Sequence, residues 1–212
     1  MHTHQERIIK KAHVENKILQ ILYLAEVNLE CCKTILNYFE KYRSDPQKET
    51  IFLNLPEGRY LTLCLNNHFF EAVELISGLL YPSKEKGEIS FILWEKIGNL
   101  KISNALQNIK DDFEKKKFLG LRHNFIAHKN IKISGDPEIV AILPIGKQMV
   151  NELKEIIQKL KQEVLRIFKN PVVNNYLLEN REGLKNILEG IQPNIDRKIS
   201  IRIKKFLSKE EK

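Results

Sequence analysis

Residues 16–39 read NKILQILYLAEVNLECCKTILNYF, and this stretch decides the fold class of the chain. It contains neither glycine nor proline, and a set of its apolar residues recurs at alternating steps of four and three. That set is Ile18, Leu22, Ala25, Leu29, Cys32, Leu36 and Phe39. A period of about 3.5 residues is typical of a helix that packs lengthwise against other helices. Residues 5–42 are therefore predicted to form one long helix.

Helical spacing continues through most of the chain, and strand patterns are nearly absent. Helices are predicted over residues 59–81, 91–97, 103–117, 121–130 and 145–169, with Ser103 as an N-cap. Residues 44–58 carry Asp-Pro and Pro-Glu-Gly signals and are predicted to be a loop, as are residues 131–144, where 139–143 form a short apolar run. Residues 170–212 are predicted to form two short helices and a tail. Together these elements predict an all-α bundle.

Composition limits the classes of function. The chain has 212 residues, 42% of them hydrophobic, and a formal net charge of +8. This basic excess favours polyanionic partners such as nucleic acid. The polar N-terminus lacks the apolar core of a secretory signal, and no uncharged apolar run approaches the roughly 20 residues that span a bilayer. A cytoplasmic protein without a membrane partner is expected, with Cys31, Cys32 and Cys64 as buried free thiols.

The most reactive pattern is LRHNFIAHKN, residues 121–130. Arg122 carries a planar cation that holds phosphate oxygens, and His128 carries an imidazole that exchanges protons near neutral pH. Such a pair can act on a phosphodiester without a metal. On an ideal helix, however, residues six positions apart point roughly 120° away from each other. Either the long arginine side chain swings towards the histidine, or two copies of the helix meet across a two-fold axis; the second arrangement is favoured.

This pattern resembles the HEPN superfamily (higher eukaryotes and prokaryotes nucleotide-binding domain). An arginine, a polar pair, two apolar residues and Ala-His, on a late helix of an α-bundle, look most like its abortive-infection, phage-resistance branch. The resemblance extends loosely over residues 59–169. It implies an up-and-down bundle over residues 1–170, with a long N-terminal helix, followed by short helices and a basic tail over residues 171–212.

The resemblance also implies an activity, that of a homodimeric, metal-independent endoribonuclease acting as a toxin or in phage defence. By position, Arg122 and His128 would be the catalytic pair, and His123, Asn124 and Lys129 would contact the RNA. An antitoxin protein is a further implied partner, and no cofactor is implied. Some family toxins are regulated by modification of a tyrosine two residues beyond the histidine, but here that position is Asn130.

Each of these residues also has a structural interpretation. Arg122 could cap a neighbouring helix or pair with a glutamate, and His128 could be a hydrogen-bonded core residue. His68, between Leu65 and Ala72 on an apolar side, is predicted to be a satisfied core histidine rather than a ligand. His123 and His128 lack the i, i+4 spacing of a metal pair, so no metal site is predicted.

Three further questions stay open at the level of sequence. Asn66 and Asn67 could face the proposed cleft or water. Residues 197–212 carry seven Lys/Arg against two Glu, and could bind RNA phosphates, dock on a partner or stay solvated. The alternative to a nuclease is a non-catalytic helical module that binds a protein or a nucleotide.

Overall fold

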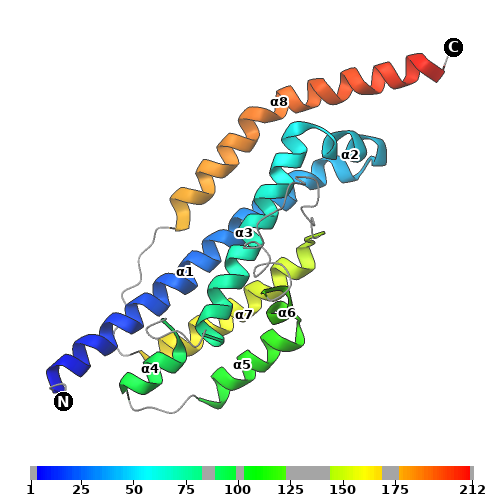
Figure 1. The fold of residues 1–212 in the computed structure, drawn as a ribbon. Coiled ribbons are helices and arrows are strands. Elements are labelled where there is room, and N and C mark those ends of the chain that lie inside the picture. The colour runs from blue at the N-terminus through cyan, green and yellow to red at the C-terminus, as the bar shows by residue number, and fades with distance from the viewer. Residues whose placement is uncertain (1–3, 83–88, 99–102, 123–143, 169–176, 211–212) are drawn as a thin grey trace, which may run out of the picture.

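The computed structural model describes residues 4–82, 89–98, 103–122, 144–168 and 177–210, and these residues form eight helices and no strand (Figure 1). The predicted all-α bundle is thereby confirmed. The helices are α1 (His4–Arg43), α2 (Pro46–Leu53), α3 (Pro56–Leu80), α4 (Phe91–Gly98), α5 (Asn104–Lys115), α6 (Phe118–Leu121), α7 (Lys147–Ile167) and α8 (Leu177–Glu210). None of these helices has the length and apolar character needed to cross a bilayer.

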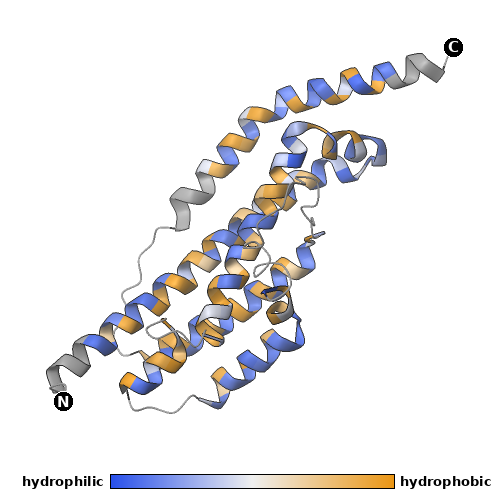
Figure 2. Cartoon of the chain, in the orientation of Figure 1, coloured by the Kyte–Doolittle hydropathy of each residue, from blue (hydrophilic) through white to orange (hydrophobic). Residues whose placement is uncertain are grey.

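Helix α1 is the centre of the bundle, because α2, α3, α4, α7 and α8 all pack against it. Its predicted apolar stripe is buried throughout, from Ile18 to Phe39. Helix α3 contributes the facing side, with Phe69, Ile76 and Leu79 fully buried. Figure 2 shows hydrophobic residues concentrated on α3 and α4, and long hydrophilic stretches on α5. The core therefore lies between α1, α3 and α7.

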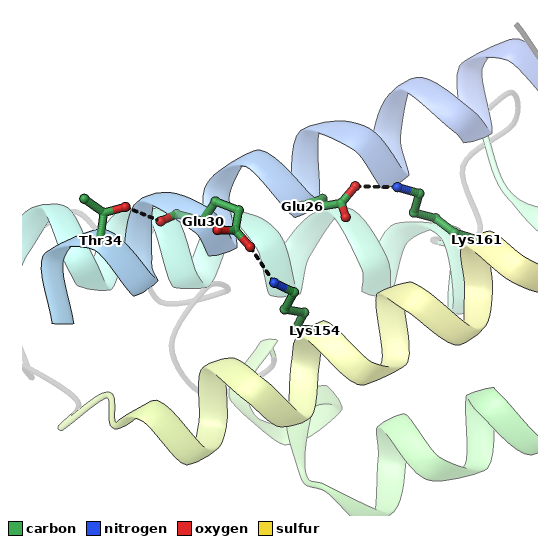
Figure 3. Close-up of polar contacts among 5 residues, drawn as sticks. All are labelled: Glu26, Glu30, Thr34, Lys154 and Lys161. Atoms are coloured by element: carbon green, nitrogen blue, oxygen red, sulfur yellow. Dashed lines mark hydrogen bonds and ion pairs between the residues drawn. The ribbon is translucent and has the colours of Figure 1, made fainter. Parts of the chain in front are cut away.

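Helix α7 runs antiparallel to α1 and is held to it by a row of ion pairs. Lys154 Nζ lies 2.5 Å from Glu30 Oε1, and Lys161 Nζ lies 2.5 Å from Glu26 Oε2 (Figure 3). The third pair joins Lys147 of α7 to Glu40 of α1 at 2.6 Å. The lysines recur every seven residues, so they share one side of α7 and fix its register along α1.

The prediction of a loop over residues 44–58 is wrong, because α2 and the first turn of α3 occupy most of it. Asp45 caps α2, since its carboxylate accepts the N–H groups of Gln47 and Lys48, and Pro46 occupies the first helical position. An Asp-Pro pair starts a helix as readily as it makes a turn. By contrast, the predicted N-cap of α5 is confirmed, with Ser103 Oγ accepting the Leu106 N–H at 3.1 Å.

The prediction of two short helices and a tail after residue 170 is also wrong. Residues 177–210 form one 34-residue helix, α8, with Pro193 inside it. A proline within a helix costs about 3 kcal/mol relative to alanine. Burial of Leu188, Ile195 and Ile199 against the bundle offsets that cost, so packing overrides local propensity here.

Helix α8 is joined to α1 and α3 by polar side chains as well. Tyr42 donates to Asp196 Oδ1 at 3.2 Å and accepts from Gln192 Nε2 at 2.7 Å. Lys198 forms an ion pair with Glu57 in the first turn of α3. Tyr42 is also stacked on Phe52 of α2, with ring centroids 4.3 Å apart. Helix α8 therefore closes the end of the bundle where α1, α2 and α3 meet (Figure 1).

Candidate functional site

The described part of the candidate site begins at the turn between α5 and α6. Lys117 has a φ of 64°, the left-handed conformation, and lets the chain change direction before Phe118. The Phe118 side chain is almost fully buried between Phe69 of α3 and Phe113 of α5, at centroid distances of 6.2 and 5.5 Å. This anchor fixes α6 against the core, and Arg122 follows directly as its C-terminal cap residue.

The Arg122 guanidinium reaches across to the end of α3. Its Nη1 donates to the backbone carbonyl oxygen of Tyr81 at 2.8 Å, in a partly buried setting. Tyr81 is the C-cap residue of α3, and carbonyls at that end of a helix lack intrahelical partners and carry partial negative charge. Arg122 therefore stabilises the end of α3, which is one of the structural roles considered from sequence.

The side chain of Tyr81 is itself held in place by residues of α5. Its hydroxyl donates to the Lys110 carbonyl oxygen at 3.0 Å, with Glu114 Oε2 at 3.3 Å, and the Lys110 ammonium lies 4.6 Å from its ring centroid. Burial, together with the negative charges of Glu114 and Asp111, raises the pKa of Tyr81 to about 12. The phenol therefore stays protonated at neutral pH and acts as a hydrogen-bond donor that ties α3 to α5.

The remaining predicted site residues, His123, Asn124, His128 and Lys129, lie outside the described residues, as does most of the helix predicted over residues 121–130. The distance between Arg122 and His128, and the pairing of two copies, are likewise untested. Of the predicted constellation, the structure places Arg122 alone, at the junction of α3, α5 and α6.

His68 has the structural role predicted for it. The ring is half-buried on α3, and its Nδ1 lies 2.7 Å from Asn28 Oδ1 on α1. Asn28 donates in turn to the Leu24 carbonyl oxygen at 3.1 Å, so its Oδ1 is left as the acceptor for an Nδ1–H of His68. Burial lowers the pKa of His68, which favours the neutral ring. The pair joins α1 to α3 and is remote in sequence from the motif.

The two asparagines next to His68 differ in setting. Asn66 is buried and donates to the Thr62 carbonyl oxygen of its own helix at 2.9 Å. Asn67 is exposed and lines an open groove of about 620 Å³ with Glu71, Glu74 and apolar residues of α1 and α3. Arg122 is absent from the described lining of this groove. Among the described residues, neither asparagine is brought to Arg122.

A second groove, of about 420 Å³, lies between α5 and α7. Its cations are already neutralised: Lys159 pairs with Asp112 at 2.9 Å and Arg166 with Glu163 at 2.6 Å. Hydrogen bonds from Arg166 and Ser103 lower the pKa of Glu163 despite its burial. This groove therefore offers little attraction to an anion.

In the part of the chain that the structure describes, no three His, Cys, Asp or Glu side chains lie together in a group that could hold a metal ion. The three cysteines are free thiols; Cys32 is buried as predicted, whereas Cys31 and Cys64 are partly exposed. Burial raises the pKa of Cys32, so this thiol stays protonated and unreactive.

Sequence reasoning missed Tyr81 as the partner of Arg122. The contact runs through a backbone carbonyl, and any residue type at that position would supply the same oxygen. The one available signal was Pro82, because a helix usually ends at or before the residue preceding a proline and thereby exposes unpaired carbonyls.

Comparisons with protein-family models, with curated proteins and with solved structures found no match for this chain. Its membership of the HEPN superfamily therefore stays a prediction that depends on residues 121–130 and on the helical architecture.

Proposed function

We propose that this protein is a metal-independent endoribonuclease that works as a cytoplasmic toxin or phage-defence protein. In this proposal two copies form one composite RNA-cleaving cleft, with Arg122 and His128 as the catalytic pair and His123, Asn124 and Lys129 contacting the RNA. The all-α bundle and the position of Arg122 support the proposal.

The proposal depends mainly on one observation, the contact that holds the Arg122 side chain in place. One of the roughly five N–H donors of the guanidinium is engaged by the Tyr81 carbonyl, the acceptor found for it among the described residues. Phe118 anchors the preceding turn in the core, so the backbone that presents Arg122 is well supported. A cation fixed in this way, with further donors not engaged by a described residue, suits preorganised stabilisation of a charged transition state.

The proposed chemistry follows from these residue types. The ribose 2′-hydroxyl attacks the adjacent phosphorus, the bond to the 5′-oxygen breaks, and the products are a 2′,3′-cyclic phosphate and a free 5′-hydroxyl. One His128 takes the 2′-hydroxyl proton, and the His128 of the second copy gives a proton to the leaving oxygen. Arg122 stabilises the charge that grows on the phosphoryl oxygens. DNA lacks the attacking hydroxyl and would stay intact.

The test is cleavage of a labelled single-stranded RNA by the purified protein in EDTA, beside a DNA strand of the same sequence. We expect RNA products that end in cyclic phosphate. His128→Ala and Arg122→Gln should each lower the rate by about 100-fold or more. His13→Ala and Arg59→Gln are matched controls, because these residues are exposed on α1 and α3 and should leave cleavage unchanged.

Two results would refute the nuclease: RNA that stays intact, or His128→Ala protein that cuts at the wild-type rate. Because Arg122 also holds the end of α3, its variant must be compared at equal folded fraction, measured by circular dichroism. Arg122→Lys keeps the charge and loses the planar fork, so partial recovery would separate charge from geometry.

The second candidate function is a non-catalytic helical module that binds a protein or nucleotide partner. The Arg122–Tyr81 contact favours it, because helix capping alone would explain the arginine. Arg122→Gln would lower the melting temperature under either function. With the non-catalytic module, however, expression of the wild-type chain would slow bacterial growth no more than expression of His128→Ala.

A further inference from the structure

Helix α8 has one side that the bundle uses and another that it leaves to solvent. Leu188, Ile195 and Ile199 are almost fully buried against α1 and α2. In Figure 1 the helix continues past the end of the bundle towards the C-terminus, and in Figure 2 hydrophilic and hydrophobic residues alternate along it. These three residues of the apolar side of α8 are thus already packed against other helices of the same chain.

The other side of α8 is strongly basic over residues 197–205. This segment contains Arg197, Lys198, Arg202, Lys204 and Lys205 and no acidic residue. On an ideal helix these five residues span an arc of roughly 160°. Arg202 lies at its edge, about 20° from the direction of Ile195, and the other four cations point farther from the buried isoleucines. The side chains of Arg197, Arg202 and Lys204 are exposed, and none forms an ion pair with a described residue, although the charge of Arg202 helps to lower the pKa of Glu57. Lys198 is paired with Glu57. We call Arg197, Lys198, Arg202, Lys204 and Lys205 the basic face of α8.

Because the apolar side of α8 is packed against the bundle, the basic face suits one kind of polyanion better than another. A helix that binds a membrane surface buries its apolar side among the acyl chains and attracts lipid headgroups with its cations. Here Ile195 and Ile199 are buried in the protein, and among the cations Ile201 is the exposed apolar side chain. A nucleic-acid backbone needs no apolar contact, because release of its condensed counterions drives binding.

We propose that the basic face of α8 binds the phosphate backbone of single-stranded RNA without regard to sequence. The choice of RNA rests on the proposed function, whereas the preference for a polyanion rests on α8 alone. The basic face holds the strand, and it contains none of the residues assigned to the chemistry.

The experiment measures RNA affinity against salt concentration, using the full chain with His128→Ala so that the probe stays intact. The probe is a fluorescein-labelled single-stranded RNA of mixed sequence, followed by anisotropy. The test variant carries Arg197→Gln, Arg202→Gln and Lys204→Gln. The matched control carries Lys17→Gln, Lys33→Gln and Lys115→Gln, three exposed lysines on α1 and α5. Each set lowers the net charge of +8 by three.

We expect the α8 variant to bind at least about tenfold more weakly at low salt, and its plot of log affinity against log salt to be shallower by about 2. The control variant should stay within about twofold of the parent chain. Equal losses in both variants would mean that net charge alone drives binding, and no loss in the α8 variant would mean that RNA binds elsewhere. Either result overturns the proposal.

Vesicles containing anionic phospholipid provide the competing partner. If the α8 substitutions abolish vesicle binding and leave RNA binding intact, the basic face is a membrane contact and the proposal fails. The cleavage assay on the chain with His128 restored separates this inference from the nuclease. RNA held through α8 but never cut would refute the nuclease alone, whereas cutting with unchanged binding by the α8 variant would refute the basic face alone.

Discussion

Helix α1 packs against α3 and against α8, and the two contacts differ in kind. The α1–α3 contact is a largely apolar seam in which Ile18, Leu22 and Phe69 are fully buried, and the His68–Asn28 hydrogen bond is a polar contact within it. The α1–α8 contact combines fewer buried side chains with a polar set formed by Tyr42, Gln192 and Asp196. Apolar burial supplies most of the stability of a fold, whereas a hydrogen bond adds about 1 kcal/mol net. The comparison indicates that α1 and α3 hold the fold together, and that α8 is an attachment that can be loosened separately.

The largest expected loss of stability comes from a substitution in the contact between α1 and α3. Phe69→Ala should destabilise the whole protein by about 3–5 kcal/mol, because it removes a fully buried ring that contacts Phe118 and Phe70. Urea unfolding followed by circular dichroism measures this. A loss below about 1 kcal/mol would contradict the central role of the seam.

A substitution in the α8 contact should act more locally. Ile195→Ala is expected to weaken attachment by about 2–4 kcal/mol, because Ile195 is fully buried. Hydrogen exchange should then show faster exchange over α8 while α1 and α3 keep their protection. Equal loss of protection in all three helices would show that the chain unfolds as one unit and would break the comparison.

The start of α3, where both contacts meet, can be probed with a matched pair of glycines. A Cβ at Gly58 would lie 2.1 Å from the carbonyl oxygen of Phe52, so Gly58→Ala should cost about 1–3 kcal/mol. Gly78 lies inside the same helix, and a Cβ there meets nothing within 4 Å. Gly78→Ala should therefore stabilise by about 0.5–1 kcal/mol in the same melting experiment. The same sign for both would contradict the packing at Gly58.

The smallest expected effect is a pH dependence of the stability that the Lys198–Glu57 pair adds to the contact between α8 and α3. The hydrogen bond and charge of Lys198 lower the pKa of Glu57 in the folded protein. Its contribution is complete above the unfolded pKa of about 4.3 and disappears as the pH falls through the lower folded value. The stability difference between the wild-type chain and Glu57→Gln should therefore shrink between pH 6 and pH 3. A difference that stays constant over this range would show that the Lys198–Glu57 pair does not stabilise the folded protein.

Sequence periodicity predicted the seam and failed at α8 for one physical reason. The stripe from Ile18 to Phe39 and the helix capped by Ser103 depend on local spacing, which the residues themselves carry. Helix α8 contains Gly183, Gly190 and Pro193, and its continuity depends on packing against α1 and α2. The Asp45-Pro46 pair failed for a related reason, since one signal serves both turns and helix starts.

At the candidate site, the sequence could identify residue types but not their partners. The chemistry of Arg122 predicts either a catalytic or a capping role. Which carbonyl it would meet depends on how α3 ends beside α6, a relation between segments 41 residues apart. The polar role of His68 was easier to predict, because a histidine on an apolar side of a helix needs a partner there.

The proposed nuclease requires Arg122 and His128 to share one pocket, and the pKa of His128, measured by NMR without substrate, reports on this proximity. A nearby cation disfavours the imidazolium form, so Arg122→Gln should raise the pKa of His128 by about 0.5 or more. Arg59→Gln, on an exposed part of α3, should leave it unchanged. If the pKa of His128 is the same with and without the Arg122 guanidinium, the two side chains do not share a pocket, and the proposed nuclease site is contradicted.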